Sequence, residues 1–513
     1  MTSRIETERT RFADDSRQRR RYAASHLTST TNAPMRPLPF HLHACTLAIA
    51  VSLALVAGGC ATPVLHPSVD VPDRFAQAAP QDEPDAAWWD SFGDPVLSTL
   101  IRKAAYENRD VKIAAERVRA ARAGEKVSRS WLFPSVGVSA GGLNAKNGYD
   151  SFKQQVVPEA KVGAGAVDVS WEVDLSGRLR AGASAAKAES IATEDAARGV
   201  RLLVLTDVAS SYFTLTGALR QLETVRAISA AQDETLRLVT ARERAGLATP
   251  FDVERAQTDA ERARAAIPPL ETLAAVSRHR IAVLIGDQAS NASSITPYTG
   301  TAVVPATRAG QPATLLQRRP DVLAANAQLE SANARRQQAA AEWFPRLFLG
   351  AAFGRGSIDI NGNALGPARF TNAAALLAMP VFNAGRTQAI NDIAESAQTE
   401  AAIRYESAMV SALEDVENAL VTLGSERQRA QSLRASAAAA VAALGHARSL
   451  YQRGQIDLLP LLDAQRAELA ARLGANDSDT QLLLDSVQLY KALGGGWQVF
   501  ETDSKSQDMR NHS

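Results

Sequence analysis

Apolar residues in the middle of the chain recur at alternating intervals of three and four, the heptad spacing of helices that pack side by side. The first such seam consists of Leu205, Val208, Tyr212, Leu215, Leu219 and Leu222. A second seam consists of Leu413, Val416, Leu420 and Leu423, each 208 residues after its counterpart. No proline interrupts the chain from Gly177 to Ala245, which predicts a helix of about 100 Å. One helix cannot bury its own seam, so the pattern indicates a helical bundle.

Other motifs repeat at similar offsets, which indicates an internal duplication. Gly177-Arg178 recurs as Gly385-Arg386 and Gly246 as Gly454, at 208 residues. Asp110-Val111 recurs as Asp321-Val322 and Phe133-Pro134 as Phe344-Pro345, at 211 residues. We therefore expect a first repeat over 60–300, a second over 301–500, and a disordered C-terminal tail over 501–513.

The stretches "FPSVGVSAGG" from Phe133 and "FPRLFLGAAFG" from Phe344 each end a polar, alanine-rich helical run. Proline forbids a continued helix, and the residues that follow alternate in polarity. Each repeat then has a turn-rich loop, with Asn361-Gly362 in the second, and another alternating segment. The pattern predicts strands over about 134–146, 161–173, 345–360 and 368–381. Such glycine-rich strands suit a membrane β-barrel better than a buried soluble sheet.

Four strands cannot close a barrel, because the smallest membrane barrels have eight. Two chains would give eight strands, but side chains fill a barrel of that size. Three chains would give twelve strands and leave a channel. The sequence therefore predicts a homotrimer that shares one barrel.

Each long helix ends at a turn. The first turn lies in "RAGLATPFDVERAQ", where Gly246 suits a helix C′ position, Thr249 an N-cap and Pro250 the first helical position. The second lies in "RGQIDLLPLLDAQ", with Gly454 as the stop and Asp457 as the next cap. We expect two helical hairpins with exposed tips at about 244–250 and 452–458. Tight turns without any further role remain the alternative.

The N-terminal region contains an apolar run from Ala44 to Ala57, too short for a membrane-spanning helix. It ends in "LVAGGC", which resembles the lipobox of bacterial lipoproteins, with Ala57 where Leu or Val is usual. We expect 1–59 to be a signal peptide, with translation from Met35, and Cys60 to carry diacylglycerol and palmitate. The alternative is a buried structural cysteine after a short core helix.

Composition argues against nucleic-acid binding and catalysis. From Cys60 onward the chain has 48 basic and 51 acidic residues and no basic patch. The four histidines of this part, His66, His279, His446 and His512, are too scattered for a metal motif, and there is no Walker loop or GxSxG. We therefore expect no enzyme activity and no cofactor other than the lipid.

The motifs "AWWDSFGDPVL" at 87–97, "RRPDV" at 318–322 and "LYKALGGGW" at 489–497, with the Phe-Pro, Gly-Arg and tip motifs, resemble the TolC-type outer-membrane factors. The nearest branch is the NodT-like lipoproteins of tripartite efflux systems. The resemblance covers nearly all of the chain from Cys60 to Phe500. It implies a mainly α fold with membrane β-structure: a trimeric conduit in which a shared 12-stranded barrel stands above a periplasmic α-barrel.

The resemblance further implies a passive exit duct in the outer membrane that exports small molecules, such as drugs or other toxic compounds. Its partners would be outer-membrane lipids, a periplasmic membrane-fusion adaptor and an inner-membrane pump of the RND type. The family's adaptor-contact motifs correspond to Arg244, Gly246, Leu247, Arg453, Gly454 and Ile456. Some members also have acidic gate residues shortly before the second tip, but here 443–454 contains no carboxylate.

Two alternatives remain open at this point. One is a periplasmic coiled-coil scaffold lipoprotein without a pore, which would have no use for four strands. The other is the exit duct of a type I protein secretion system. The sequence does not identify the exported compound, the adaptor or the pump.

Overall fold

A computed structural model describes residues 62–67, 69–77, 82–146, 159–300 and 302–501. The predicted signal peptide, Cys60, most of the loop before residue 159 and the tail beyond 501 lie outside these residues. The 3-10 helices are η1 (Trp88–Phe92), η2 (Ala289–Ser294) and η3 (Ala341–Trp343). The α-helices are α2 (Pro95–Glu107), α3 (Arg109–Ser130), α5 (Arg178–Arg244), α6 (Pro250–Ala265), α7 (Ile267–Leu284), α8 (Pro312–Leu316), α9 (Pro320–Ala340), α10 (Arg386–Gln452) and α11 (Leu458–Ala492). The strands are β1 (Ser135–Ala145), β2 (Ala160–Val173), β3 (Arg346–Ile360) and β4 (Asn363–Ala378).

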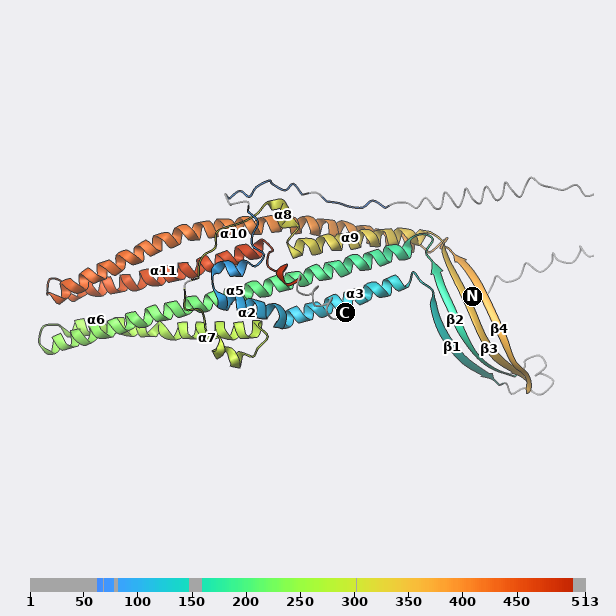
Figure 1. Cartoon of the computed structure of the whole chain (residues 1–513), viewed down its shortest axis with the longest axis horizontal. Coiled ribbons are helices and arrows are strands. Elements are labelled where there is room, and N and C mark those ends of the chain that lie inside the picture. The colour runs from blue at the N-terminus through green and yellow to red at the C-terminus, as the bar shows by residue number, and fades with distance from the viewer. Residues whose placement is uncertain (1–61, 68, 78–81, 147–158, 301, 502–513) are drawn as a thin grey trace, which may run out of the picture. The chain divides into compact units, whose positions relative to one another are not determined.

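The duplication is visible in the helices. Helices α5 and α10 each contain 67 residues, and both their first and their last residues are 208 positions apart. The first seam is buried as predicted, since Leu205, Val208 and Tyr212 are 0% exposed. Figure 1 shows the sheet at one end of these helices and the two hairpin tips at the other. The predicted class, mainly α with a four-stranded sheet, is confirmed.

The four strands form one antiparallel sheet in the order β1-β2-β3-β4. The central pair runs in register from Ala160↔Ile360 to Val173↔Leu347. Each strand directly continues a helix: α3 leads into β1, β2 into α5, α9 into β3, and β4 into α10. Consequently the helices follow the strand order, with α3 packed on α5, α5 on α9, and α9 on α10.

The fourth strand differs from its prediction. It covers Asn363–Ala378 rather than 368–381, because the predicted loop is a two-residue turn. Asn361 (φ 52°) and Gly362 (φ 82°) are both left-handed, as a type I′ hairpin turn requires. The strand also stops before Pro380, which has no N–H for a ladder hydrogen bond.

Both long helices begin at a glycine with positive φ, Gly177 (80°) and Gly385 (83°). This conformation turns the chain from strand to helix, and L side chains are strained in it. At the first turn the Asp174 carboxylate accepts hydrogen bonds from the main-chain N–H groups of Leu179 (3.1 Å) and Arg180 (2.9 Å). A carboxylate here satisfies donors that the first helical turn would otherwise leave free.

The remaining long helices pack back against the layer formed by α3, α5, α9 and α10. Helices α6 and α7 pack on α5, and α11 packs between α10 and α5. Helix α5 contains an apolar window long enough to cross a membrane, but 61% of that window is buried within the protein. Its hydropathy therefore follows from its central position in the bundle.

An aromatic cluster half-way along the helices joins the two ends of the chain. The ring of Trp88 stacks on Tyr490 with centroids 5.3 Å apart, and Trp89 stacks on Phe500 at 5.6 Å. Gly496 has a φ of 114°, and a Cβ there would lie 2.7 Å from the Trp88 Nε1. The tryptophan motif and the C-terminal glycine motif thus form one packing unit.

A buried tyrosine ties this cluster to the start of α2. The Tyr212 hydroxyl donates to Asp94 Oδ2 at 2.7 Å and accepts from the Tyr298 main-chain N–H at 3.0 Å. The other Asp94 oxygen accepts from the N–H groups of Val96 and Leu97 and so caps α2. Burial raises the pKa of the Tyr212 hydroxyl, which keeps it a donor.

We predict that Tyr212→Phe lowers the free energy of unfolding by about 1–3 kcal/mol, because it leaves an oxygen of the buried Asp94, and the part-buried Tyr298 N–H, without this partner. Unfolding of the purified protein in detergent, followed by circular dichroism, measures the effect. Tyr298→Phe is the matched control, since it keeps the main-chain donor. Equal stability of the two variants would contradict the prediction.

Candidate functional site

The two hairpin tips have the same main-chain hydrogen bonds. At the first, the Gly246 N–H donates to the Glu243 carbonyl and the Leu247 N–H to the Arg242 carbonyl, both at 2.8 Å. At the second, the N–H groups of Gly454 and Gln455 donate in the same way to Tyr451 (3.0 Å) and Leu450 (2.9 Å). Both tips are Schellman motifs, which place a left-handed residue just after the helix.

These motifs explain the glycines. Gly246 has a φ of 74° and Gly454 a φ of 70°. A Cβ at either glycine would meet nothing within 4 Å. The backbone conformation, and not crowding, therefore favours glycine, and the space over both tips is open.

The helices that follow the two tips have different N-terminal caps. At the first tip Thr249 and Asp252 form a reciprocal capping box around Pro250. The hydrogen bond from the Thr249 main chain lowers the pKa of Asp252. At the second tip Asp457 occupies the N-cap position without a side-chain hydrogen bond to the helix. The predicted cap positions are therefore correct, and the first tip is the more firmly capped.

The structure separates the six predicted contact residues into two groups. Arg244, Gly246, Arg453 and Gly454 are exposed, and the Leu247 side chain is 68% exposed. Ile456 instead is half-buried and packs against a cluster that joins the two hairpins. Ile456 thus supports the second tip from within, while the other five residues form the accessible surface of the two tips.

That cluster is the inter-hairpin cluster, which consists of Val239, Ala256, Leu444, Tyr451, Leu458, Leu461 and Leu462. Its members come from both hairpins, so the tips share a small core. Arg242 reinforces it, with its guanidinium carbon 5.0 Å from the centre of the Tyr451 ring. The geometry is that of a cation–π interaction.

An ion pair fixes the hairpins to each other further from the tips. Arg466 on α11 donates to both oxygens of Asp259 on α6, with the shortest distance 2.8 Å. Asp259 is 4% exposed, and its hydrogen bonds raise the pKa of Arg466. Because Asp259 is buried, removal of Arg466 would leave its charge only the longer ion pair with Arg262, at 3.6 Å.

Two exposed apolar residues at the tips were not predicted from the sequence. Phe251 is 66% exposed and Leu459 is 45% exposed, each in the first turn of a returning helix. Each lies beside a tip that the sequence did identify, and Phe251 directly follows Pro250.

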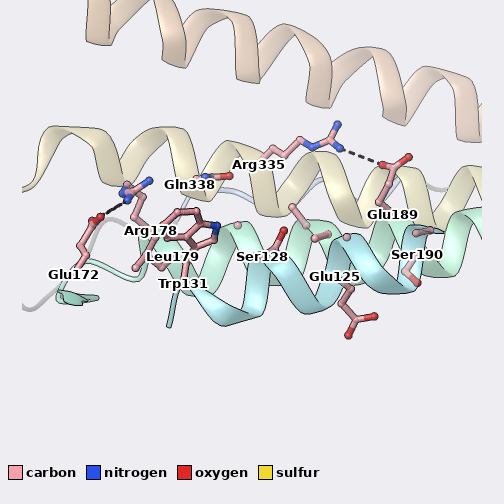
Figure 2. Close-up of a pocket in the computed structure, with 15 residues that line it drawn as sticks. Glu125, Ser128, Trp131, Glu172, Arg178, Leu179, Glu189, Ser190, Arg335 and Gln338 are labelled. Carbon is pink, nitrogen blue, oxygen red and sulfur yellow. Dashed lines mark hydrogen bonds and ion pairs between the residues drawn. The ribbon is translucent and has the colours of Figure 1, made fainter. Parts of the chain in front are cut away.

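At the other end of the helices, a cavity of about 690 Å³ lies between α3, α5 and α9, where they meet the sheet. Figure 2 shows Arg178 directed toward Glu172, and Arg335 toward Glu189. Arg178 donates to both Glu172 oxygens at 2.8 Å, and Arg335 donates to Glu189 at 3.2 Å. Each of these two ion pairs joins neighbouring elements at the cavity wall, Arg178 of α5 to β2 and Arg335 of α9 to α5.

The described residues contain no cluster of His, Cys, Asp and Glu that could hold a metal ion. The features that distinguish this chain are instead exposed surfaces: two hairpin tips and a sheet with apolar outer residues. Val136 and Val138 of β1 are 69% and 84% exposed. Such surfaces bind partners or lipid, because water does not favour large apolar patches.

The family model described as outer membrane efflux protein matches residues 100–287 and 312–495. The chain belongs to the outer membrane efflux protein family. The two matched stretches fall one in each half of the duplication. The chain is 30% identical over 458 residues to outer membrane protein OprJ of Pseudomonas aeruginosa, covering 87% of this chain and 95% of that one.

Solved structures agree with this assignment. The outer-membrane channel OprN matches with a TM-score of 0.75 and 28% identity, over 85% of this chain and all of that one. The open state of the MtrE outer membrane channel of Neisseria gonorrhoeae matches with a TM-score of 0.76 and 26% identity, over 86% and 98%. The predicted TolC-like fold is confirmed.

The protein is therefore an outer-membrane efflux channel, the outer-membrane component of a tripartite efflux pump. Its sheet lies in the outer membrane and its helices extend into the periplasm. Members of this family are channels, and the exposed tips of this chain agree with that role.

Proposed function

We propose that the working channel is a homotrimer that docks a periplasmic adaptor of an RND-type pump at its hairpin tips and exports small toxic compounds. The observation that carries the proposal is that the sheet and the helical layer end at the same two edges, where neither has a neighbouring element. Strands β1 and β4 are the sheet edges, and α3 and α10 are the edges of the helical layer that continues them.

Both edge helices carry apolar side chains that nothing in the described chain covers. On α3 these are Ile113 and Val127, which are 50% and 60% exposed. On α10 they are Ile403, Val410 and Val421, which are 59%, 54% and 46% exposed. At about 100° per residue, each set falls within about 40° on one helix face. A second copy of the chain supplies complementary edges for both.

The number of copies follows from the sheet. An unpaired strand edge is untenable in hydrocarbon, so the sheet must be closed by other copies. Three copies give twelve strands, enough for an open channel, whereas eight strands give a filled barrel. Closure by three chains also completes a ring of helices below the barrel.

The tips suit an adaptor because they combine open glycine backbone, exposed apolar side chains and cations. Arg244 and Arg453 make no ion pair with any other residue of the described chain. Leu247 and Phe251 add apolar surface beside the first tip. Three chains with two tips each would present six similar sites to a ring of adaptor hairpins, preferably ones with acidic and apolar residues.

The substrate class and pump type rest on relatives. The toluene efflux pump outer membrane protein TtgI of Pseudomonas putida is 30% identical over 413 residues, and the cation efflux system protein CusC of Escherichia coli K12 is 27% identical over 470. Their names point to small toxic solutes rather than secreted proteins. The four-stranded sheet speaks against a pore-free scaffold. Purification of the protein with its pump would separate the RND type from a type I secretion system.

We further propose that Cys60 is the first mature residue and carries the diacylglycerol and palmitate that anchor it to the outer membrane. The support is the apolar run and "LVAGGC" before it. A relative named "Probable outer membrane lipoprotein SilC", of Salmonella typhimurium, is 27% identical over 465 residues. The barrel then acts as a second anchor.

The trimer proposal predicts that the pair Ile403→Glu and Val410→Glu lowers the trimer fraction at least tenfold, because it places two charges in an apolar contact between copies. Native mass spectrometry in mild detergent measures it. Ser411→Glu, about 80° away around the same helix, adds a charge outside the contact and should leave the trimer intact. A parent protein that is monomeric or dimeric would refute the proposal.

Docking at the tips predicts that a Gly246→Glu, Gly454→Glu double variant still assembles but loses export and adaptor binding. Asparagine tolerates the left-handed conformation, so the Gly246→Asn, Gly454→Asn variant is the matched control and should retain most of both. Export of a dye substrate from whole cells and co-purification of the adaptor are the measurements. Full export by the assembled glutamate variant would show that the tips are not the docking site.

Lipid attachment predicts that the mature N-terminal peptide has the mass of a triacylated Cys60. Cys60→Ser should abolish acylation yet leave part of the export, because the barrel still holds the protein in the membrane. Mass spectrometry of the purified protein decides the first point and the whole-cell assay the second. A mature chain that begins elsewhere, or with unmodified Cys60, would exclude the lipid anchor.

A further inference from the structure

The described residues 62–67 and 69–77 form an extended segment, the strap, that runs along the helices. Figure 1 shows it in dark blue beside α10. At its C-terminal end Phe75 is 9% exposed and packs in a cluster with α10 residues, and the Ala76 N–H donates to Glu417 Oε1 at 2.7 Å. At its N-terminal end the contacts are of a different kind.

There, two buried amide side chains hold the main chain of the strap. Asn333 of α9 accepts from the Leu65 N–H and donates to the Leu65 carbonyl, both at 3.3 Å. Gln398 of α10 donates to the Pro63 carbonyl at 2.9 Å and to Asn333 Oδ1 at 2.7 Å. Asn333 is 6% exposed and Gln398 is 3% exposed.

These buried amides depend on the strap for hydrogen-bond partners. Polar groups buried to this extent need hydrogen-bond partners, and removal of the strap would leave Asn333 without its two main-chain partners. All three bonds to the strap go to main-chain atoms of Pro63 and Leu65. They therefore fix the position of an extended backbone whatever its side chains are.

The position of the clamp along α10 matters for the membrane. Gln398 lies twelve residues after Arg386, so it is about 18 Å from the start of α10, the end of the helix that follows the sheet. Cys60 precedes Pro63 by three residues, which span at most about 11 Å. An acyl group on Cys60 is therefore restricted to the side of α9 and α10 near the sheet.

We propose that Asn333 and Gln398 are positioning residues that clamp the strap and thereby place the acylated Cys60 beside the membrane-facing end of the helices. Without the clamp, the next described strap residue that packs against a hydrophobic cluster would be Val69, partly buried against the same cluster as Phe75. The tether between lipid and protein would lengthen from three residues to nine. The proposal rests on the lipid attachment proposed above.

Hydrogen–deuterium exchange of the full-length protein in detergent tests the clamp. The Asn333→Leu, Gln398→Met double variant replaces the amides by apolar groups of similar volume, so that no unpaired side chain remains. Strap amides, above all that of Leu65, should exchange at least tenfold faster than in the parent, while α9 and α10 exchange at the parental rate. Gln388→Met, an exposed change on the same helix whose amide bonds only to Asp392, should alter nothing.

A second measurement tests the placement. The natural cysteines are Cys45 and Cys60 alone, so Thr62→Cys gives one free thiol for a fluorescent probe in the mature lipoprotein. In lipid nanodiscs, a head-group quencher should quench the probe to the same extent in the parent and in Gln388→Met. The double variant should differ at least twofold.

The outcomes separate the two proposals. Unchanged strap exchange or unchanged quenching in the double variant, or a parental strap that already exchanges as fast as an unstructured peptide, overturns the clamp. Mass spectrometry of the same samples reports the lipid independently. An unmodified Cys60 overturns the lipid attachment and with it the placement of an acyl group, even if the strap is held as described.

Discussion

The unpaired edges of the four-stranded sheet constrain everything else in this protein. A bilayer offers no hydrogen-bond partners, so the N–H and C=O groups along β1 and β4 must be satisfied by other protein. Each strand continues a helix, and for this reason the same requirement fixes the order of α3, α5, α9 and α10. In the proposed trimer, association that closes the sheet would align the helices as well, and their apolar outer faces would become contacts between copies.

The second requirement is that two similar halves act as one body. The aromatic cluster meets it, because Trp88 and Trp89 near the start of the described chain stack on Tyr490 and Phe500 near its end. The inter-hairpin cluster repeats the principle near the tips on a smaller scale. Between the two, the hairpins are joined by isolated polar contacts such as Arg466 with Asp259.

Much of this could be predicted because the signals were local or repeated. Heptad spacing fixed the long helices, and Gly246 and Gly454 marked their ends by a conformation that few other residues adopt. The type I′ turn at Asn361 was underestimated, although its Asn-Gly pair is a strong hairpin signal. Contacts between distant segments had no such signal. The buried position of Ile456, the ring stacking of Trp88 and the bonds of Asn333 to the strap depend on which helices meet, and one sequence does not encode that visibly.

The two-residue turn between β3 and β4 also determines what the cell presents to its surroundings. Because the helices extend into the periplasm, Asn361 and Gly362 mark the far end of the sheet, at the outer surface. A turn this short offers almost no area for an antibody or a bacteriophage to recognise. The connection between β1 and β2 is much longer. External recognition at this end of the β3–β4 hairpin is therefore restricted to very few residues.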